Sequence, residues 1–402
     1  MKGMKTLRSG RNRRKWIYVL LLMGLLGLSG CGSPSSASME MSSQASTEAD
    51  VTVAEQTELV KTGSMELQYA ENFTVDYYEG GYKLLTTLPD DKRYLLVPEG
   101  QGVPADLDED ICVLQEPLQN IYLVASGVMD MFASVDAVDQ IRFSGQKQEN
   151  WYIQTAKDAM AAGNMIYAGK YSKPDYELLV SEGCDLAIEN RMITHSPEVV
   201  EMLQSFDIPV MIEYSSYEQH PLGKVEWVKF FGALTGQEVE AEEAFAEQTE
   251  ILEEVESGEK TGKTIAFFYV TSNGLIQVRQ STDYIPKLIE LAGGRYIFED
   301  LEDSGSGRST LNMQVEDFYA GAKDADILIY NSSIDGGVTT VDELIGKCNI
   351  LKDFKALQEG QVYCTTNDMY QQSMAIGYLL QDMHTVLTDD DTAKLRYLFL
   401  LQ

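Results

Sequence analysis

The chain has 402 residues, of which 44% are hydrophobic, so it is long enough for two or three domain-sized units with buried cores. Its 31 Lys and Arg against 63 Asp and Glu give a formal net charge of −32. This balance argues against a nucleic-acid-binding protein, which needs clustered basic side chains. Three His, and five Cys without CxxC spacing, argue against a His-rich metal site, a zinc ribbon and an iron–sulfur centre.

The first thirty residues have the pattern of an export signal. Seven Lys and Arg precede an apolar run of 13 residues at 16–28, which is shorter than the roughly 20 residues of a membrane span. The run ends in LSGC at 28–31, which resembles the lipobox of bacterial lipoproteins. The resemblance implies a signal peptide over 1–30 and a diacylated Cys31 as the new N-terminus. The alternative is an ordinary secretory signal that happens to contain a cysteine.

Cleavage after residue 30 would leave 24 of the 31 basic side chains and all 63 acidic ones, a net charge of −39. Residues 32–64 are rich in Ser, Ala, Thr, Glu and Gln, and such a composition cannot bury enough surface to fold. We therefore expect a flexible tether over 31–64 that anchors the protein at the outer face of the cytoplasmic membrane. No later segment has 18 uninterrupted apolar residues, so we expect no further membrane span.

Strand-like and helix-like segments follow the tether. Alternating residues and a Gly-containing turn predict a β-rich extension over 66–115, with strands at 73–77, 82–86, 94–97 and 111–114. Apolar runs then alternate with helical patterns. The expected strands are 121–125, 140–143, 165–167, 185–188 and 210–212. The expected helices are 128–134, 151–162, 175–181 and 196–206. This order is typical of βαβ units with a parallel sheet.

A helical block and a second alternating region complete the chain. Helices are expected at 222–234 and 239–257, and the second would span about 28 Å. The expected strands beyond it are 264–270, 295–298, 326–330 and 361–364, and the expected helices are 284–292, 315–320, 340–345 and 351–357. We predict an α/β fold of two lobes, each with a mostly parallel sheet flanked by helices, joined by one long connecting helix. The boundaries are 65–221 for the extension and N-lobe, 222–257 for the connector and 258–402 for the C-lobe.

Three motifs resemble a known family. They are KPDYELL at 173–179 with CDLAI at 184–188, VEDF at 315–318 with ADILI at 325–329, and LTG at 234–236 ahead of the long acidic helix. The chain is similar to the solute-binding proteins of ABC importers for cobalamin, haem and ferric siderophores, over roughly residue 121 to the end. It departs from the pattern where Cys-Asp and Ala-Asp replace Pro-Asp, and the segment 66–115 has no counterpart.

The resemblance implies partners and docking residues. In such proteins one Glu on each lobe docks into Arg pockets of the permease, and the matching positions are Glu177 and Glu316. The alternative is that both belong to ordinary solvated helix faces. The implied partners are an ABC permease with its ATPase and a small-molecule ligand, and the protein would be a monomer without enzymatic activity.

Candidate ligand contacts follow from the expected strand ends, because ligands of α/β proteins bind at the carboxyl ends of parallel strands. They are Ser144, Lys147, Tyr167, Tyr171, Glu189, Asn190, Arg191, Tyr214, Tyr269, Arg295, Asn331 and Tyr370. Aromatic rings with a few Arg and polar groups suit a bulky chelate such as a ferric siderophore, haem or cobalamin. The alternatives are that Tyr167 and Tyr171 only fix their loop, and that Glu189 or Glu213 neutralises Arg191.

The remaining His and Cys predict no chemistry. His195 and His220 each precede an expected helix start and are interpreted as capping or turn residues, so we predict neither a metal site nor an intrinsic cofactor. Cys348 and Cys364 could pair, although small buried thiols are the default. The leading hypothesis is a lipid-anchored solute carrier of an importer. The alternatives are a surface lipoprotein that senses its ligand and, last, an enzyme, for which no catalytic motif is present.

Overall fold

The computed structural model describes residues 59–301, 309–332 and 336–402. The chain divides into the units Met1–Val53 and Ala54–Gln402, and every described residue belongs to the second. The predicted signal peptide, Cys31 and most of the predicted tether lie outside the described residues. The end of the tether needs correction, because Lys61–Ser64 forms strand β1, which pairs antiparallel with the next strand. Its side chains are all exposed, so backbone pairing without apolar burial places it in the sheet.

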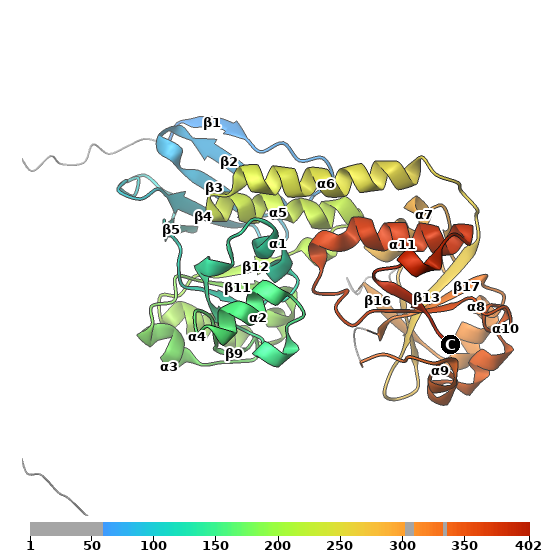
Figure 1. Cartoon of the computed structure of the whole chain (residues 1–402). Helices are drawn as coiled ribbons and strands as arrows, with labels where there is room; N and C mark the ends of the chain where they lie inside the picture. Colours follow the sequence, from blue (N-terminus) through green and yellow to red (C-terminus); the bar gives the residue numbers. More distant parts are fainter. Residues whose placement is uncertain (1–58, 302–308, 333–335) are drawn as a thin grey trace, which may run out of the picture. The chain divides into compact units, whose positions relative to one another are not determined.

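The β-rich extension is a five-stranded sheet in the order β1-β2-β3-β4-β5 (Figure 1). Its remaining strands are β2 (Phe73–Tyr78), β3 (Lys83–Thr87), β4 (Lys92–Val97) and β5 (Ile111–Gln115). The pairs are antiparallel except β4 with β5, which is parallel. Gly80 and Gly81 make the β2–β3 turn with positive φ, a conformation that favours glycine. The predicted hairpin is therefore confirmed.

The N-lobe is built on a parallel sheet in the order β12-β11-β6-β7-β8. Its strands are β6 (Ile121–Leu123), β7 (Ile141–Ser144), β8 (Ile166–Tyr167), β11 (Leu186–Asn190) and β12 (Val210–Glu213). Its helices are α1 (Val128–Ser134), α2 (Gln154–Ala161), α3 (Tyr176–Ser181) and α4 (Pro197–Ser205). A small hairpin joins β9 (Gly169–Lys170) to β10 (Lys173–Pro174). Burial on both faces explains why the strands are nearly continuous apolar runs.

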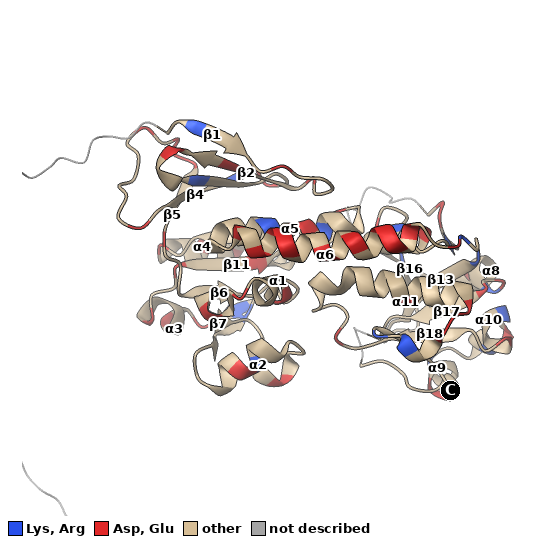
Figure 2. Cartoon of the chain, turned by 45° about the horizontal axis from the view of Figure 1, so that its top comes forward, with Lys and Arg blue, Asp and Glu red and all other residues tan. Residues whose placement is uncertain are grey.

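Two helices connect the lobes, α5 (Pro221–Thr235) and α6 (Glu238–Glu256), and they pack against each other. The His220 side chain caps the first helix, and Gly236 ends it in the left-handed conformation. Nearly every residue of α5 is buried, since the extension, both lobes and α6 surround it. In contrast, α6 exposes a row of Glu side chains (Figure 2).

The C-lobe contains a mixed seven-stranded sheet in the order β16-β14-β13-β17-β18-β19, with β15 beside β13. Its strands are β13 (Thr264–Val270), β14 (Ile276–Arg279), β15 (Arg295–Tyr296), β16 (Thr310–Met313), β17 (Ile327–Tyr330), β18 (Val362–Thr365) and β19 (Leu398–Leu400). Its helices are α7 (Tyr284–Leu291), α8 (Val315–Ala322), α9 (Val341–Lys347), α10 (Lys355–Gln358) and α11 (Ile376–Thr388). Strands β13, β17 and β18 run parallel, whereas β14, β16 and β19 pair antiparallel.

The largest hydrophobic cluster runs through both lobes. It combines residues of β6, β7 and α1 with residues of α5, α6, α7 and α11, and it extends to the inner face of the β1–β5 sheet. Short 3-10 helices join these elements: η1 (Glu79–Gly81), η2 (Val138–Gln140), η3 (Gln148–Asn150), η4 (Arg191–His195), η5 (Ser215–Tyr217), η7 (Asn349–Asp353), η8 (Ser373–Ala375) and η9 (Thr392–Lys394). The predicted α/β class with two helix-flanked sheets is confirmed. No helix in the described ranges is both long and apolar enough to cross a bilayer.

Candidate functional site at the carboxyl edges of the two sheets

The loops after β7 and β8 bring Lys147 and Tyr167 together. Tyr167 is 40% exposed, and the Lys147 Nζ lies 6.0 Å from the centroid of its ring. Tyr171 is half-buried against the N-lobe core. Ser144 needs correction as a ligand residue, because its hydroxyl accepts bonds from Gln146 N and Trp151 Nε1 and donates to Gln146 O. Its hydrogen-bonding capacity is used within the loop.

The ends of β11 and β12 carry Glu189, Asn190, Arg191 and Tyr214. Glu189 is fully buried, neither carboxyl oxygen has a hydrogen-bond partner, and burial raises its pKa to about 8. Glu189 therefore does not neutralise Arg191, whose guanidinium instead stacks 4.5 Å from the ring centroid of Tyr217. The Asn190 side chain caps η4 by accepting from Met192 N at 2.8 Å. Its amide oxygen is therefore occupied by the backbone.

Tyr214 is 6% exposed and meets the Tyr217 ring edge-on at 6.5 Å between centroids. Burial, reinforced by the nearby Asp90, raises the pKa of its hydroxyl. Tyr217 is the exposed member of the pair, and the sequence reasoning missed it. Its position in the loop after an expected strand was the available signal.

The C-lobe places three of its four candidates at the carboxyl edge. Tyr269 is half-buried near the end of β13, Asn331 follows β17 and is 3% exposed, and Tyr370 follows β18 and is 37% exposed. The prediction that Arg295 lies at the carboxyl edge is wrong. It pairs with Thr264, the first residue of β13, so it lies at the amino edge of the sheet, exposed and 3.4 Å from Glu299. A two-residue strand carries too little pattern to show which end of the sheet it meets.

The carboxyl-edge loops of the two lobes meet through Gln371, which is fully buried. Its Nε2 donates to Asn150 O at 2.9 Å, and its Oε1 accepts from Tyr152 N at 2.8 Å. Beside it, the Asp130 carboxylate accepts from Met374 N at 2.7 Å, and burial raises the pKa of Asp130 to about 6. The strand-end loops of the two sheets are therefore in direct contact, and we call this contact between the lobes the seam.

The exposed tyrosines gather at these edges. In the described part of the chain, the tyrosines exposed by more than a third are Tyr152, Tyr167, Tyr217 and Tyr370. Tyr152, Tyr217 and Tyr370 follow β7, β12 and β18, and Tyr167 is the last residue of β8, so all four are at carboxyl ends. We call these four residues the tyrosine rim. Each of the three N-lobe members has a cation over its ring. The Lys157 Nζ lies 5.9 Å from the ring centroid of Tyr152, Lys147 lies over Tyr167, and Arg191 lies over Tyr217.

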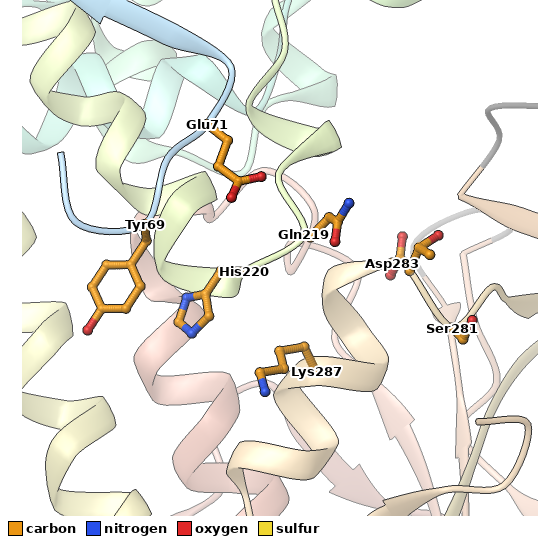
Figure 3. A pocket seen from close by; sticks show the side chains of 8 residues that line it. Tyr69, Glu71, Gln219, His220, Ser281, Asp283 and Lys287 are labelled. Atoms are coloured by element: carbon orange, nitrogen blue, oxygen red, sulfur yellow. The ribbon is translucent and has the colours of Figure 1, made fainter. Parts of the chain in front are cut away.

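A pocket of about 370 Å³ opens between the extension, the start of α5 and the start of α7 (Figure 3). It is lined by Tyr69 and Glu71 of the extension, Gln219 and His220 before α5, and Ser281, Thr282, Asp283 and Lys287 around the start of α7. None of these residues was a predicted ligand contact. His220 caps α5 by accepting from Leu222 N at 3.2 Å, as predicted, and stacks on Tyr69 at 4.4 Å. Burial and the nearby Lys287 lower its pKa, so its ring is neutral at pH 7.

Helix α5 presents buried charges close to the seam. The Glu226 carboxylate accepts from the backbone N–H groups of residues 68, 69 and 70, each at 2.8 Å. The Lys229 Nζ lies 2.9 Å from Glu242 and 3.5 Å from Glu226. The Lys224 Nζ lies 4.8 Å from the ring centroid of Tyr284 on α7. These side chains were not expected in the interior.

The two docking candidates lie in corresponding places on the two lobes. Glu177 is in the first turn of α3 and Glu316 in the first turn of α8. Both are exposed, and neither forms an ion pair with any residue that the structure describes. Their carboxylates are therefore available to an external basic partner.

The described His and Cys residues do not gather into a metal site. No group of three or more His, Cys, Asp or Glu suited to a metal ion occurs among the described residues. The His384 Nδ1 lies 2.9 Å from Ala292 O, and His195 ends η4. Cys348 and Cys364 are both buried thiols.

Comparison with known proteins identifies the fold. No family model matches the chain. Two uncharacterized lipoproteins of Methanocaldococcus jannaschii are 24% and 23% identical over 401 and 371 residues, covering 92% and 89% of this chain and 92% and 90% of theirs.

Solved structures align with about two thirds of the chain. A possible iron-binding, periplasmic solute-binding protein of Staphylococcus epidermidis aligns with a TM-score of 0.52 and 16% identity, covering 67% of this chain and 98% of that one. The periplasmic heme-binding protein of Vibrio cholerae aligns with a TM-score of 0.53 and 14% identity, covering 66% and 98%. Both are described as periplasmic binding proteins. The chain has the mixed α/β fold of the periplasmic solute-binding proteins.

Proposed function

We propose that this protein is an extracytoplasmic, lipid-anchored solute-binding protein of an ABC importer. It captures a bulky chelate-type nutrient, such as a ferric siderophore, haem or cobalamin, and delivers it to a permease. Cys31 carries the lipid anchor, and two relatives along almost the whole length are named as lipoproteins. The fold and the absence of a catalytic motif in the sequence support a binding role.

The observation that carries the proposal is the tyrosine rim. Exposed aromatic rings from four separate segments offer flat apolar surface, and aromatic stacking contributes about 0.5–1.5 kcal/mol per pair beyond area burial. The rim lies where parallel strands end and where loops of both lobes touch. Ligands of α/β folds bind at such a place. A large ring-like or chelated solute can contact several rim residues at once.

A ligand screen tests the proposal. The purified lipoprotein is mixed with haemin, cobalamins and ferric chelates, and the melting temperature and visible spectrum are recorded. A ligand of the folded protein raises the melting temperature as its concentration increases. At a concentration of 100 times Kd it raises the free energy of unfolding by about 2.7 kcal/mol. The double variant Tyr167→Ala/Tyr217→Ala should weaken that ligand more than tenfold. Phe206→Ala removes an aromatic ring of similar exposure away from the rim and should leave affinity unchanged. No response to any compound contradicts the proposal.

A further inference from the structure

One of the buried charges on α5 has no ionic partner. Glu226 and Lys229 are accounted for by backbone N–H groups and by carboxylates. Lys224 is 8% exposed, yet among the described residues no carboxylate or hydrogen-bond acceptor lies within bonding distance of its Nζ. Its contact is with the face of the Tyr284 ring.

A mostly buried lysine without an ionic partner contributes less to stability than an apolar side chain would at the same position. Burying most of this side chain costs the ammonium part of its hydration, and no ion pair with a described residue offsets that loss. A ring face compensates for only a small part of that loss. Its helix neighbours Leu222 and Val225 are fully buried apolar residues, as packing alone would favour. The charge at Lys224 therefore points to a role other than stability.

Two carboxyl groups act on Lys224 electrostatically without bonding to it, Asp130 and Glu213. Asp130 accepts from the backbone of Met374 at 2.7 Å. Glu213 accepts from the N–H and hydroxyl of Ser215 at 2.8 Å and 2.5 Å. Each carboxyl is thus directed to a backbone group of its own. Lys224 retains its capacity to donate hydrogen bonds.

Lys224 lies where the two lobes meet. Helix α5 packs against α1 of the N-lobe and against α7 and η8 of the C-lobe. Glu213 is the last residue of β12, so this region adjoins the carboxyl edge of the N-lobe sheet. Asp130 and Met374 join the lobes at the same place, next to the clamp made by Gln371. The ammonium therefore lies close to the contact between the two lobes.

We propose that Lys224 binds an anionic oxygen group, a carboxylate or similar oxyanion, on the solute that this protein carries. The inference rests on the proposed function and narrows it to ligands with at least one negative group. The cations over the tyrosine rim, Lys147, Lys157 and Arg191, favour the same class. In a chain with 63 acidic side chains, these three cations at the N-lobe edge are an exception to the overall charge.

The test compares ligands of opposite charge on matched variants of the lipoprotein. The probes are haemin, which has two carboxylates, its uncharged dimethyl ester, anionic ferric citrate and a cationic ferric trihydroxamate. Lys224→Met removes the charge at similar volume, Lys224→Arg keeps it, and Lys352→Met removes an exposed lysine elsewhere. We expect an anionic probe to bind the wild type, to lose at least tenfold in affinity with Lys224→Met, and to be unaffected by Lys352→Met. Lys224→Arg should restore most of the affinity.

Two further readouts separate this inference from the carrier function. The melting temperature of ligand-free Lys224→Met should equal or exceed that of the wild type, and a lower value would overturn the inference by marking Lys224 as structural. Equal affinity of an anionic probe for wild type and Lys224→Met, or binding of the uncharged and cationic probes alone, would also overturn it and leave the carrier function standing. If no probe binds, the carrier function fails. In that case the inference is tested by comparing melting temperatures in trisodium citrate and in sodium chloride at equal ionic strength. Citrate should raise the melting temperature of the wild type and not that of Lys224→Met. Any other result overturns the inference.

Discussion

Buried carboxyl groups at the carboxyl edge of the N-lobe keep their protons above the pH at which free carboxyls lose them. Burial raises the pKa of Glu189 to about 8 and that of Asp130 to about 6, and it also raises the pKa of Glu213. At neutral pH Glu189 is therefore uncharged. The negative potential around Lys224 and Arg191 is weaker than a count of acids in the sequence implies. An anionic ligand meets less repulsion there than on the exposed surface of α6.

The charge of Glu189 makes stability depend on pH. Its carboxyl ionises near 4.5 in the unfolded chain and near 8 in the folded protein, so between these values the folded state binds more protons. The free energy of unfolding should therefore fall as pH rises through this window, by up to about 1.4 kcal/mol per pH unit. Glu189→Gln removes this contribution, so its stability relative to wild type should increase from pH 5 to pH 8 in urea titrations. The exposed Glu198→Gln is the control, and parallel wild-type and Glu189→Gln curves would refute the assignment.

At the scale of elements, the extension is held by two buried carboxylates, one on α5 and one in the segment just before it. Glu226 accepts three backbone N–H groups of residues 68–70, and Glu218 accepts those of Glu71 and Asn72 at 2.9 Å and 3.0 Å. The Trp227 indole also donates to Glu218 at 2.9 Å. The five amides lie on consecutive residues, so the segment entering the β1–β5 sheet is fixed along its length. The extension is in this way part of the body that carries the site.

Glu226→Gln tests this attachment. The amide retains one acceptor oxygen but directs an NH₂ group at backbone donors, and the substitution removes one of the two carboxylates beside Lys229. Loss of a buried charged acceptor should lower the free energy of unfolding by at least about 3 kcal/mol, measured by chemical denaturation. Glu243→Gln on the exposed face of α6 should change it by less than about 0.5 kcal/mol. A loss below 1 kcal/mol for Glu226→Gln would show that apolar packing alone holds the extension.

Local signals in the sequence predicted many elements but not their contacts. The buried strand β13 has its predicted bounds, Thr264–Val270, because a run of apolar residues suffices to mark it. Strands β14 and β16 were missed, since they are short, carry polar residues and depend on pairing with each other. Helix α11 was also missed, although Leu379, Leu380 and Met383 do recur at helical spacing.

The candidate site was predictable only in part. Tyr167 and Tyr370 lie at strand ends that the sequence pattern places, so both reach the rim. Gln371 could not be predicted as a clamp, because its partners Asn150 and Tyr152 are 221 and 219 residues away. Lys224 likewise lies on a helix that the sequence predicts. Its burial depends on α7 of the C-lobe, which packs against that helix. Long-range burial leaves no local pattern.

At the scale of the whole molecule, the shared core limits how the lobes can move. Residues of both lobes join α5, α6, α7 and α11 in one hydrophobic cluster, and Gln371 clamps the edges. Opening the seam widely would expose part of this core. We therefore expect small hinge motions on ligand binding and not a wide closure. Glu177 and Glu316, one on each lobe, would then keep a nearly constant spacing for a permease.

Charge reversal tests this docking. The double variant Glu177→Arg/Glu316→Arg should abolish ligand uptake in cells, because it places cations against the basic sockets expected on the permease. Ligand affinity of the purified protein should stay within about twofold, since both residues are exposed on helix starts. Glu201→Arg/Glu359→Arg makes the same charge change on exposed residues elsewhere and should transport normally. Normal uptake by the first double variant would show that docking uses other residues.

The most direct measurement of where the solute binds is hydrogen–deuterium exchange with and without the compound that binds most tightly. Bound solute should slow exchange in residues 148–152, 190–193 and 366–373, the loops that carry or adjoin the tyrosine rim. Exchange at the amino edge, around residues 294–296, should not change. Protection confined to the amino edge, to the pocket beside Tyr69 or to no region at all would contradict a binding site between the carboxyl edges.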